Sequence, residues 1–183
     1  MIQKKEITEK TNSEKSKIAK IRLGALFSSG KDSTYAIYLQ RRLNFEIVCL
    51  ITLDSKNKDS YMFHTPTINL AKYQAEALQL PILITKTKGE KEEELKDLKA
   101  AISEAKEKFG IMGITTGALY SNYQRERIEK LCEELDLKCF SPLWHMDQEE
   151  EMKSLLKDGF EFIFTKVAAE GLDSSWLGKM ITA

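Results

Sequence analysis

The stretch Leu26-Phe27-Ser28-Ser29-Gly30-Lys31-Asp32-Ser33 decides the fold that this sequence predicts. An apolar run precedes it from Ile21, and an amphipathic segment follows it to about Leu43. A strand that leads through small residues into a helix presents unpaired backbone N–H groups and the positive end of the helix dipole. Serine hydroxyls and the Lys31 ammonium add further donors. We therefore expect a phosphate-binding loop between a β-strand and an α-helix.

This loop differs from the Walker A loop of NTPases that transfer a γ-phosphate. Five residues rather than four separate Gly24 from Gly30, and Asp32 stands where a magnesium-binding hydroxyl should follow Lys31. Transfer of a γ-phosphate is therefore disfavoured. The alternative without function is a serine-rich turn that happens to contain Gly-Lys-Asp.

After Ile21, short apolar runs alternate with amphipathic segments, which is typical of βαβ units around a buried parallel sheet. Most runs lack the alternation of a sheet with one wet face, so helices should cover both faces. The prediction is an α/β three-layer sandwich with a mainly parallel, twisted sheet of about five or six strands. The strand candidates are 21–27, 45–53, 81–85, 111–116, 137–140 and 160–167.

Capping signals and apolar stripes place the helices between these strands. Helix starts are expected at Thr65 before a proline, at Ser121 and at Asp147, and Gly110 and Gly159 are expected to close helices. Two stripes at helical spacing mark core faces rather than sites. They are Leu95, Leu98, Ile102 and Ala105 in one helix, and Ile128, Leu131, Cys132 and Leu135 in the next.

The composition is that of one soluble globular domain. The chain has 183 residues, of which 42% are hydrophobic and 31% are charged. Lys plus Arg and Asp plus Glu both number 28, so no net charge favours a polyanion and no nucleic-acid partner is expected. Cys49, Cys132 and Cys139 are widely spaced, which argues against a disulfide framework or a structural zinc site.

The first twenty residues carry six lysines and three glutamates and form no apolar segment. We therefore expect a charged N-terminal arm over residues 1–20 and one domain over residues 21–183. The arm is read as a frayed helix or a disordered tail, with contact to an acidic partner as the alternative. No membrane-spanning or secretory segment is expected, and a cytoplasmic location is the default.

Polar and aromatic side chains follow other strand candidates, at the edge where ligands bind in open α/β sheets. Tyr61 and His64 follow the second candidate, and each could instead be a packing or capping residue. The same alternative holds for Tyr123, near the helix start at Ser121. Arg127, in the second turn of that helix, could bind a phosphate or a carboxylate, or form a surface ion pair.

The loop resembles the PP-loop of the ATP pyrophosphatase superfamily, Ser-Gly-Gly-Lys-Asp-Ser, with Ser29 in place of its second-position glycine. A serine there would be strained if its φ were positive. From Ile21 to Lys179 the chain resembles one family of that superfamily, the diphthine ammonia ligases. The implied fold is HUP-like and Rossmann-like, of the adenine nucleotide alpha hydrolase type. The matching segments are 26–33, 60–66, 74–78, 116–127, 142–144, 166–172 and 176–178.

The resemblance implies amidation of diphthine on elongation factor 2 to diphthamide, with ammonium as the nitrogen source. ATP would be converted to AMP and pyrophosphate through an acyl-adenylate, and Mg²⁺ would assist, with Asp32 as its nearest ligand. The implied catalytic residues are Lys31, Asp32 and Arg127. The implied nucleotide-binding residues are Phe27, Ser28, Ser29, Gly30, Lys31, Asp32, Ser33, Leu53 and Gly117. The implied substrate-binding residues are Tyr61, His64, Ser121, Tyr123, Gln124, Trp144 and Glu170.

Two other functions stay open at this stage. One is a PP-loop enzyme that modifies tRNA, which would usually carry cysteine pairs and a basic surface. The other is a non-catalytic module that binds adenine nucleotides. We also expect Lys31 to be an exposed loop lysine whose replacement leaves the fold intact.

The C-terminal end of the chain carries a separate expectation. Members of the family usually continue with a Gly-Glu-Gly-Gly-Glu-type segment that does not follow here, so the chain is either truncated or complete without it. The segment 170–178 should return beside the cleft. Trp176 and Leu177 should be less covered than their type prefers, unless an extension or a second subunit of a homodimer buries them.

Overall fold

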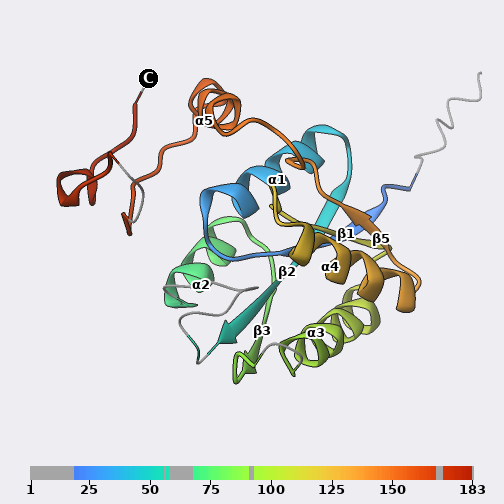
Figure 1. Cartoon of the computed structure of the whole chain (residues 1–183). Coiled ribbons are helices and arrows are strands. Elements are labelled where there is room, and N and C mark those ends of the chain that lie inside the picture. Colours follow the sequence, from blue (N-terminus) through green and yellow to red (C-terminus); the bar gives the residue numbers. More distant parts are fainter. Residues whose placement is uncertain (1–18, 56, 58–67, 91–92, 168–170, 183) are drawn as a thin grey trace, which may run out of the picture.

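The fold is built on a sheet of five parallel strands (Figure 1). The computed structural model describes residues 19–55, 57, 68–90, 93–167 and 171–182. The elements follow one another as β1 (Arg22–Leu26), α1 (Lys31–Arg42), β2 (Glu46–Ser55), α2 (Ile68–Ala77), β3 (Ile82–Thr87), α3 (Glu93–Phe109), β4 (Gly113–Thr115), α4 (Asn122–Glu134), β5 (Lys138–Phe140), α5 (Gln148–Lys157) and a 3₁₀ turn, Ser174–Trp176.

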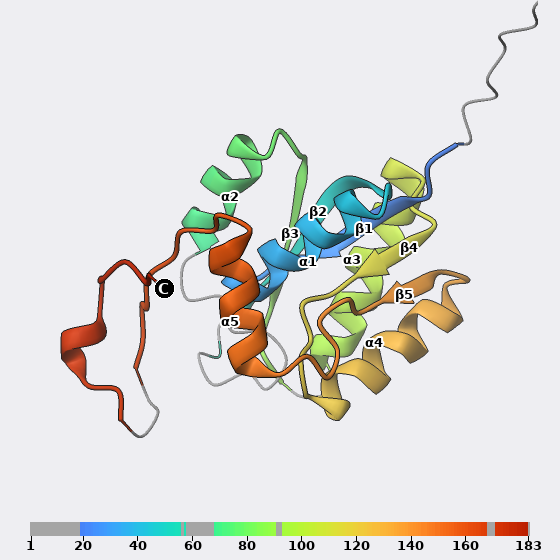
Figure 2. The same cartoon turned by 90° about the horizontal axis from the view of Figure 1, so that it is seen from above.

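Helices cover both faces of the sheet, so the three-layer sandwich is confirmed (Figure 2). On one face, α1 and α2 bury Ile37 and Ala71 against the sheet, and on the other face α3 and α4 bury Ile102 and Ile128. The strands have apolar side chains on both faces because neither face meets water. The stripes predicted for α3 and α4 lie in the second of these cores.

The strand order, β3-β2-β1-β4-β5, determines where a ligand can bind. From β1 the chain moves outward through β2 to β3, and it then returns to pair β4 with the other side of β1. The connections on the two sides of β1 therefore diverge and leave a crevice at the carboxyl ends of β1 and β4. The loop 27–30 leaves β1 at this point.

Helix ends largely follow the sequence signals. The Ser121 hydroxyl accepts a hydrogen bond from the backbone N–H of Gln124 at 3.3 Å, and the Asp147 carboxylate accepts one from Glu149 at 2.9 Å. Gly110 and Gly159 follow α3 and α5 with φ of 58° and 82°, which glycine adopts without strain. The helix start expected at Thr65 lies outside the described residues, as do residues 1–18 of the predicted arm.

The sixth strand candidate, 160–167, is wrong as a strand of the sheet. This segment forms two isolated bridges with the C-terminal residues, Ile163 with Met180 and Phe164 with Leu177. Its side chains nevertheless alternate as in a strand, since Phe160 and Phe162 pack beside α1 and α5 while Ile163 is exposed. Alternation predicts an extended backbone, but a strand of the sheet also needs a neighbouring strand. Among the described residues, this segment pairs with the C-terminal end of the chain instead.

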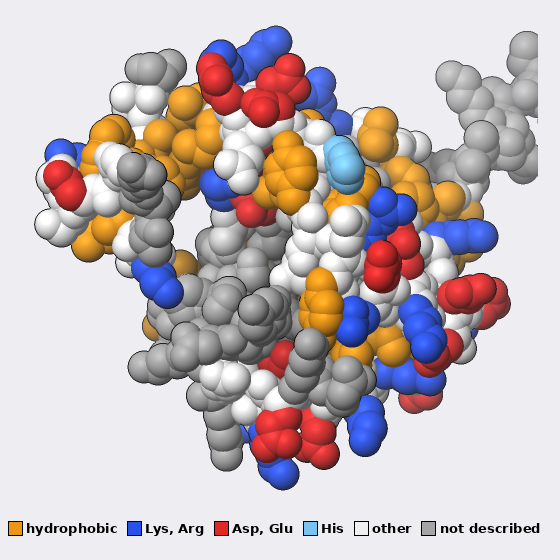
Figure 3. Space-filling view, in the orientation of Figure 1, with side chains coloured by type: hydrophobic (Ala, Val, Ile, Leu, Met, Phe, Trp, Pro, Cys, Tyr) orange, Lys and Arg blue, Asp and Glu red, His pale blue; other side chains and the backbone are white. Residues whose placement is uncertain are grey.

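The C-terminal residues pack against that segment and extend away from the sheet (Figures 1 and 2). Trp176 is 41% exposed and Leu177 is 44% exposed, as expected for this pair. Apolar side chains gather on this part of the surface, at the upper left of Figure 3. Residues 171–182 line neither of the cavities described below, although Leu177 pairs with Phe164, a lining residue of the second one. Within the described ranges, no helix is both long enough and apolar enough to cross a membrane.

Candidate functional site

The loop between β1 and α1 is held by its own hydroxyl groups. The Ser33 hydroxyl donates to the Gly30 carbonyl at 3.0 Å and accepts from the Ser28 backbone N–H at 3.3 Å. Thr34 also donates to the Gly30 carbonyl, at 2.9 Å. Upstream, the Phe27 carbonyl accepts from the Thr52 hydroxyl at 2.8 Å, which ties the end of β1 to β2. The loop is therefore preformed.

The N-terminus of α1 is left open by this arrangement. Its N-cap residue is Gly30, and no side chain caps it in the described structure, in contrast to Ser121 on α4 and Asp147 on α5. Uncapped N–H groups and the positive end of the helix dipole favour an anion at this place. The geometry fits the predicted phosphate-binding loop.

Ser29 has a φ of 64°, so the loop uses the left-handed conformation at the position where the superfamily carries glycine. A serine in that region is strained, because its Cβ approaches the carbonyl oxygen. Ser29 therefore adopts a conformation that a glycine at this position would take without strain.

Gly117, the second residue after β4, lies against the first turn of α1. A Cβ at this position would be 2.7 Å from the backbone nitrogen of Ser33, a distance that no side chain tolerates. The close approach brings the end of β4 to the phosphate loop. Gly117 is therefore at the predicted site for a packing reason that only glycine satisfies.

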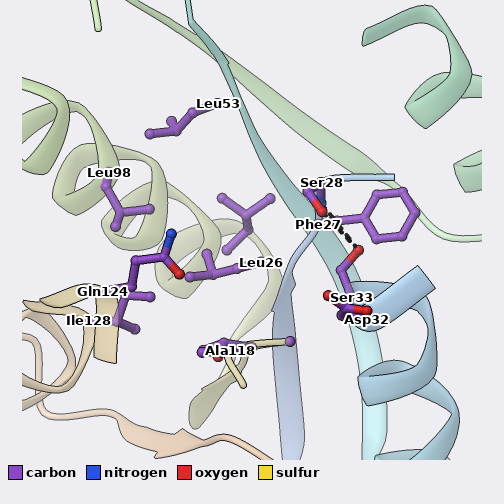
Figure 4. Close-up of a pocket in the computed structure, with 13 residues that line it drawn as sticks. Leu26, Phe27, Ser28, Asp32, Ser33, Leu53, Leu98, Ala118, Gln124 and Ile128 are labelled. Carbon is purple, nitrogen blue, oxygen red and sulfur yellow. Dashed lines mark hydrogen bonds between the residues drawn. The ribbon is translucent and has the colours of Figure 1, made fainter. Parts of the chain in front are cut away.

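A cavity of about 230 Å³ opens beside the loop, at the carboxyl ends of β1, β2 and β4 (Figure 4). Its wall combines apolar side chains with the polar edge formed by Ser28, Asp32 and Ser33. Gln124 and Ile128, one turn apart on α4, face the loop across it. The remaining lining residues are Leu26, Phe27, Ile51, Leu53, Leu98, Thr116, Gly117 and Ala118. The structure thus brings together the predicted nucleotide-binding residues Phe27, Leu53 and Gly117 with the predicted substrate residue Gln124.

Phe27 and Leu26 point to opposite sides of the sheet. Figure 4 shows the Phe27 ring directed away from Leu26 and Gln124, and the ring packs in the core under α1 and α2. Its backbone, rather than the face of its ring, is what this residue offers beside the loop. The apolar side chains on the cavity side include those of Leu26, Leu53 and Leu98.

Lys31 is held between two carboxylates. Its ammonium donates to Glu151 of α5 at 2.6 Å and to its neighbour Asp32. The Lys31 side chain is 27% exposed and that of Glu151 is 1% exposed, so the expectation of an exposed loop lysine is wrong. Glu151 was not among the residues predicted from sequence. The signal that marks it is its spacing of four residues from Leu155, which places both on the buried face of α5.

Burial and charge act in opposite directions on this cluster. Burial lowers the pKa of Lys31, but its hydrogen bonds to Asp32 and Glu151 raise it by more, so the ammonium stays charged. Burial raises the pKa of Glu151 to about 7; the hydrogen bond from Lys31 opposes this rise, and Asp32 adds to it. The second oxygen of Glu151, Oε1, is buried and finds no hydrogen-bond partner among the described residues.

A second cavity, of about 480 Å³, lies on the other side of the same loop. Its wall includes Ser29, Lys31 and Thr34, together with residues 160–166 and two side chains of α2, Leu70 and Gln74. The Gln74 amide donates to the Ser29 carbonyl at 3.3 Å. The phosphate loop therefore forms a wall between two hollows.

Arg127 and Trp144 lie outside the linings of both cavities. The Arg127 guanidinium stacks 3.5 Å from the centre of the Tyr123 ring and donates to the Tyr123 carbonyl at 3.3 Å. The guanidinium of Arg125 lies over the Trp144 ring, 4.7 Å from the centre of that ring. Tyr61, His64 and Glu170, also predicted as substrate residues, lie outside the described residues.

Beside the loop, Asp32 offers one carboxylate for a magnesium ion. Asp32 is 37% exposed and lines the first cavity, whereas no group of three or more His, Cys, Asp or Glu side chains suited to a metal occurs in the described part of the chain. Mg²⁺ commonly takes one carboxylate and completes its shell with water and phosphate oxygens. A lone Asp32 matches that use.

Comparison with known proteins identifies the family. The sequence pattern of the diphthamide synthase N-terminal domain matches residues 21–139. The chain is 34% identical over 180 residues to the diphthine–ammonia ligase of Rattus norvegicus, with 88% of this chain and 67% of that protein covered. It is 33% identical over 183 residues to the enzyme of the same name from Homo sapiens, with 88% and 67% covered.

A longer relative and a solved structure complete the comparison. The match to the diphthine–ammonia ligase of Saccharomyces cerevisiae, at 30% identity, covers 84% of this chain but 27% of that protein. A crystal structure from Methanocaldococcus jannaschii, described as a predicted subunit of tRNA methyltransferase, superposes with a TM-score of 0.51 at 16% identity, covering 82% of each chain. The latter likeness concerns the fold alone. The sequence matches show that the chain belongs to the diphthine–ammonia ligase family.

Proposed function

We propose that this chain catalyses the ATP-dependent amidation of diphthine on elongation factor 2, the reaction for which its relatives are named. The observation that carries the proposal is the open N-terminus of α1, whose uncapped N–H groups lie between two cavities. The first cavity has apolar walls and a polar edge formed by Ser28, Asp32 and Ser33, and the second is lined by Lys31. Such a site suits a ligand with a flat apolar part and a highly charged part, as in ATP.

The chemistry needs activation because a carboxylate is a poor electrophile. A carboxylate oxygen of diphthine would attack the α-phosphorus of ATP, and the bond from that phosphorus to the bridging oxygen would break, releasing pyrophosphate. Ammonia, formed when ammonium loses a proton, would then attack the acyl carbon and release AMP. The products are the amide, AMP and pyrophosphate.

Negative charge grows on the pyrophosphate as it leaves, and the loop is arranged to meet it. The backbone N–H groups at the start of α1 and the Lys31 ammonium are fixed before the reaction, so they stabilise the transition state at little cost in reorganisation. Asp32 would hold Mg²⁺, which neutralises phosphate charge when bound.

The base of ATP would lie in the first cavity, against Leu26, Leu53 and Leu98. The acceptor would approach from the side of α4, where Gln124 offers an amide to the cavity. Ser121, Tyr123 and Trp144 would support this side, with Tyr61, His64 and Glu170 as further contacts of the acceptor. Both parts of the reaction would then share one crevice at the carboxyl ends of β1 and β4.

The test is to incubate the protein with ATP, ammonium and diphthine-bearing elongation factor 2, and to measure AMP, pyrophosphate and the amide. AMP and pyrophosphate are expected in equal amounts, and only when all three substrates are present. ADP as the main product would reject attack at the α-phosphorus. AMP formation that depends on tRNA instead of elongation factor 2 would point to the tRNA-modifying alternative.

A further inference from the structure

Glu151 is a buried carboxylate that contacts the key lysine of the phosphate loop from a distant part of the chain. Its side chain is 1% exposed, and its Oε2 lies 2.6 Å from the Lys31 ammonium. Glutamates are almost never fully buried unless they are paired. The pair joins α5 to the first residue of α1.

The position of Glu151 is fixed by contacts on both sides of it. Asp147 caps the start of α5, and Leu155 lies in a core cluster with Tyr35 of α1. Just after α5, the Asp158 carboxylate accepts a hydrogen bond from the Tyr35 hydroxyl at 2.9 Å. Lys31 and Tyr35 of α1 thus contact Glu151 and Asp158 in the same order along the two segments. Because α1 and α5 are joined at both places, Glu151 is a rigid support for Lys31.

A lysine ammonium has three N–H donors. Asp32 and Glu151 accept from Lys31, which leaves one donor for a phosphate oxygen. With two acceptors in place, the direction of the third N–H is determined, and a long flexible side chain has already lost the rotamer freedom that binding would otherwise remove.

We propose that Glu151 is a positioning residue, which orients the Lys31 ammonium so that its remaining N–H faces the pyrophosphate bound at the loop. The role within the reaction rests on the proposed function, whereas the orientation of Lys31 toward a phosphate group does not. Glu151 acts through Lys31 and lines neither cavity itself.

Stability alone is a weak reason for this buried pair. Replacing a buried ion pair by apolar residues of similar volume is often neutral or stabilising. In addition, the Oε1 oxygen of Glu151 is buried without a hydrogen-bond partner among the described residues, which is unfavourable for the folded state. A carboxylate that is costly to bury, placed on the phosphate-loop lysine, fits a role in function better than a role in folding.

The experiment compares Glu151→Gln with Glu151→Leu, because both remove the negative charge and only glutamine keeps an oxygen that accepts from Lys31. The first measurement is calorimetric binding of inorganic pyrophosphate, which needs no turnover. Loss of a hydrogen bond to a charged group corresponds to about a ten-fold loss of affinity. The Gln variant should therefore bind pyrophosphate about ten-fold more tightly than the Leu variant.

The second measurement is steady-state AMP formation. The Leu variant should lose about ten-fold in kcat with KM for ATP nearly unchanged, because Lys31 acts mainly on the departing pyrophosphate, and the Gln variant should recover most of kcat. Glu150→Gln is the matched control, since Glu150 is exposed on the same helix. It should behave as the wild type in both measurements.

Thermal melting separates a positioning role from a structural one. The Leu variant removes one partner of the pair and is expected to melt lower than the wild type. Pyrophosphate binding and turnover are therefore compared at a temperature at which melting shows all variants to be folded. Equal pyrophosphate binding by the Gln and Leu variants would overturn the proposal. If the wild type binds pyrophosphate but forms no AMP, the proposed function fails, while the binding difference still decides the role of Glu151.

Discussion

Gly117 touches the backbone of Ser33 so closely that a Cβ on Gly117 would lie 2.7 Å from the Ser33 nitrogen. The neighbours that it would meet are backbone atoms at the start of α1, which cannot rotate away as a side chain could. The end of β4 and the phosphate loop therefore form one rigid unit.

Replacement of Gly117 by Ala should displace the first turn of α1 and disrupt the phosphate loop. We expect a loss of AMP formation of at least about a hundred-fold, since misplacement of a reacting group by about 1 Å has such an effect. Gly110→Ala is the control: Gly110 also has a positive φ, 58°, but nothing lies within 4 Å of its added Cβ. That variant should lose about 1 kcal/mol of stability and keep its turnover. Normal activity of Gly117→Ala would show that the loop can shift without harm.

Ser29 offers a gain in stability. A serine with this φ of 64° destabilises the folded state by about 1 to 2 kcal/mol. A glycine would remove this strain, but its greater freedom in the unfolded chain would offset about 0.5 to 1 kcal/mol of the gain. Ser29→Gly should therefore raise the unfolding free energy by about 0.5 kcal/mol, as measured by urea denaturation. Ser29→Ala keeps the Cβ and should show no gain. A lower stability of the glycine variant would mean that the serine side chain makes a compensating contact.

Lys31→Ala should abolish AMP formation and also destabilise the protein, contrary to the expectation from sequence. Removing Lys31 leaves the buried Glu151 carboxylate unpaired, and breaking a buried pair costs about 3 to 5 kcal/mol. The double variant Lys31→Ala/Glu151→Leu should recover most of the stability and none of the activity. Thermal melting at pH 8 and an AMP assay on the three proteins test this. If Lys31→Ala alone melts like the wild type, Glu151 is less dependent on Lys31 than the structure indicates.

The raised pKa of Glu151 predicts a pH dependence of stability. Because burial raises this pKa from an ordinary 4.5 to about 7, the folded state binds the proton more tightly than the unfolded state does. The resulting stability is fully present below pH 4.5 and is lost as the pH rises through 7, by up to about 3 kcal/mol. Unfolding free energies at pH 5.5 and pH 8 should therefore differ less in Glu151→Gln than in the wild type. Parallel pH profiles would contradict the assignment.

Sequence patterns predicted those parts of the fold that depend on local order. The five strands and the caps at Ser121 and Asp147 follow from apolar runs and from residue types at helix starts. The phosphate loop was predictable because a strand, small residues and a helix stand next to one another in the chain. The reversal of strand order at β1 is not local, but the loop sequence indicated the fold that contains it.

The parts that sequence missed depend on contacts between distant elements. Glu151 lies in the run Glu149-Glu150-Glu151, which looks like the solvated start of a helix, and only the packing of α5 on α1 brings it to Lys31. The segment 160–167 alternates as a strand does, yet the alternation could not show that its partners lie at the end of the chain. The division at residue 20, Mg²⁺ and the roles of the individual site residues stay predictions.

Replacement of Arg127 tests whether this residue of α4 binds a ligand directly or supports Tyr123. Sequence suggested a phosphate or carboxylate ligand, whereas the guanidinium stacks on the Tyr123 ring at 3.5 Å and lines neither cavity. We therefore expect Arg127 to support Tyr123. A cation–π contact of this kind contributes about 1 to 2 kcal/mol, so Arg127→Ala should raise KM for the protein substrate about ten-fold. ATP affinity should stay within about two-fold of the wild type.

The exposed Lys130 on the same helix provides the control, since Lys130→Ala removes a positive charge of α4 without touching the Tyr123 ring. It should change neither KM nor ATP affinity beyond the small effect of a distant surface charge. Arg127→Lys keeps the charge but loses the planar stacking, so its KM should lie between those of the wild type and the alanine variant. A ten-fold loss of ATP affinity in Arg127→Ala, with KM for the protein substrate unchanged, would instead assign Arg127 to the phosphates, because a residue that only supports Tyr123 has no direct effect on nucleotide charge.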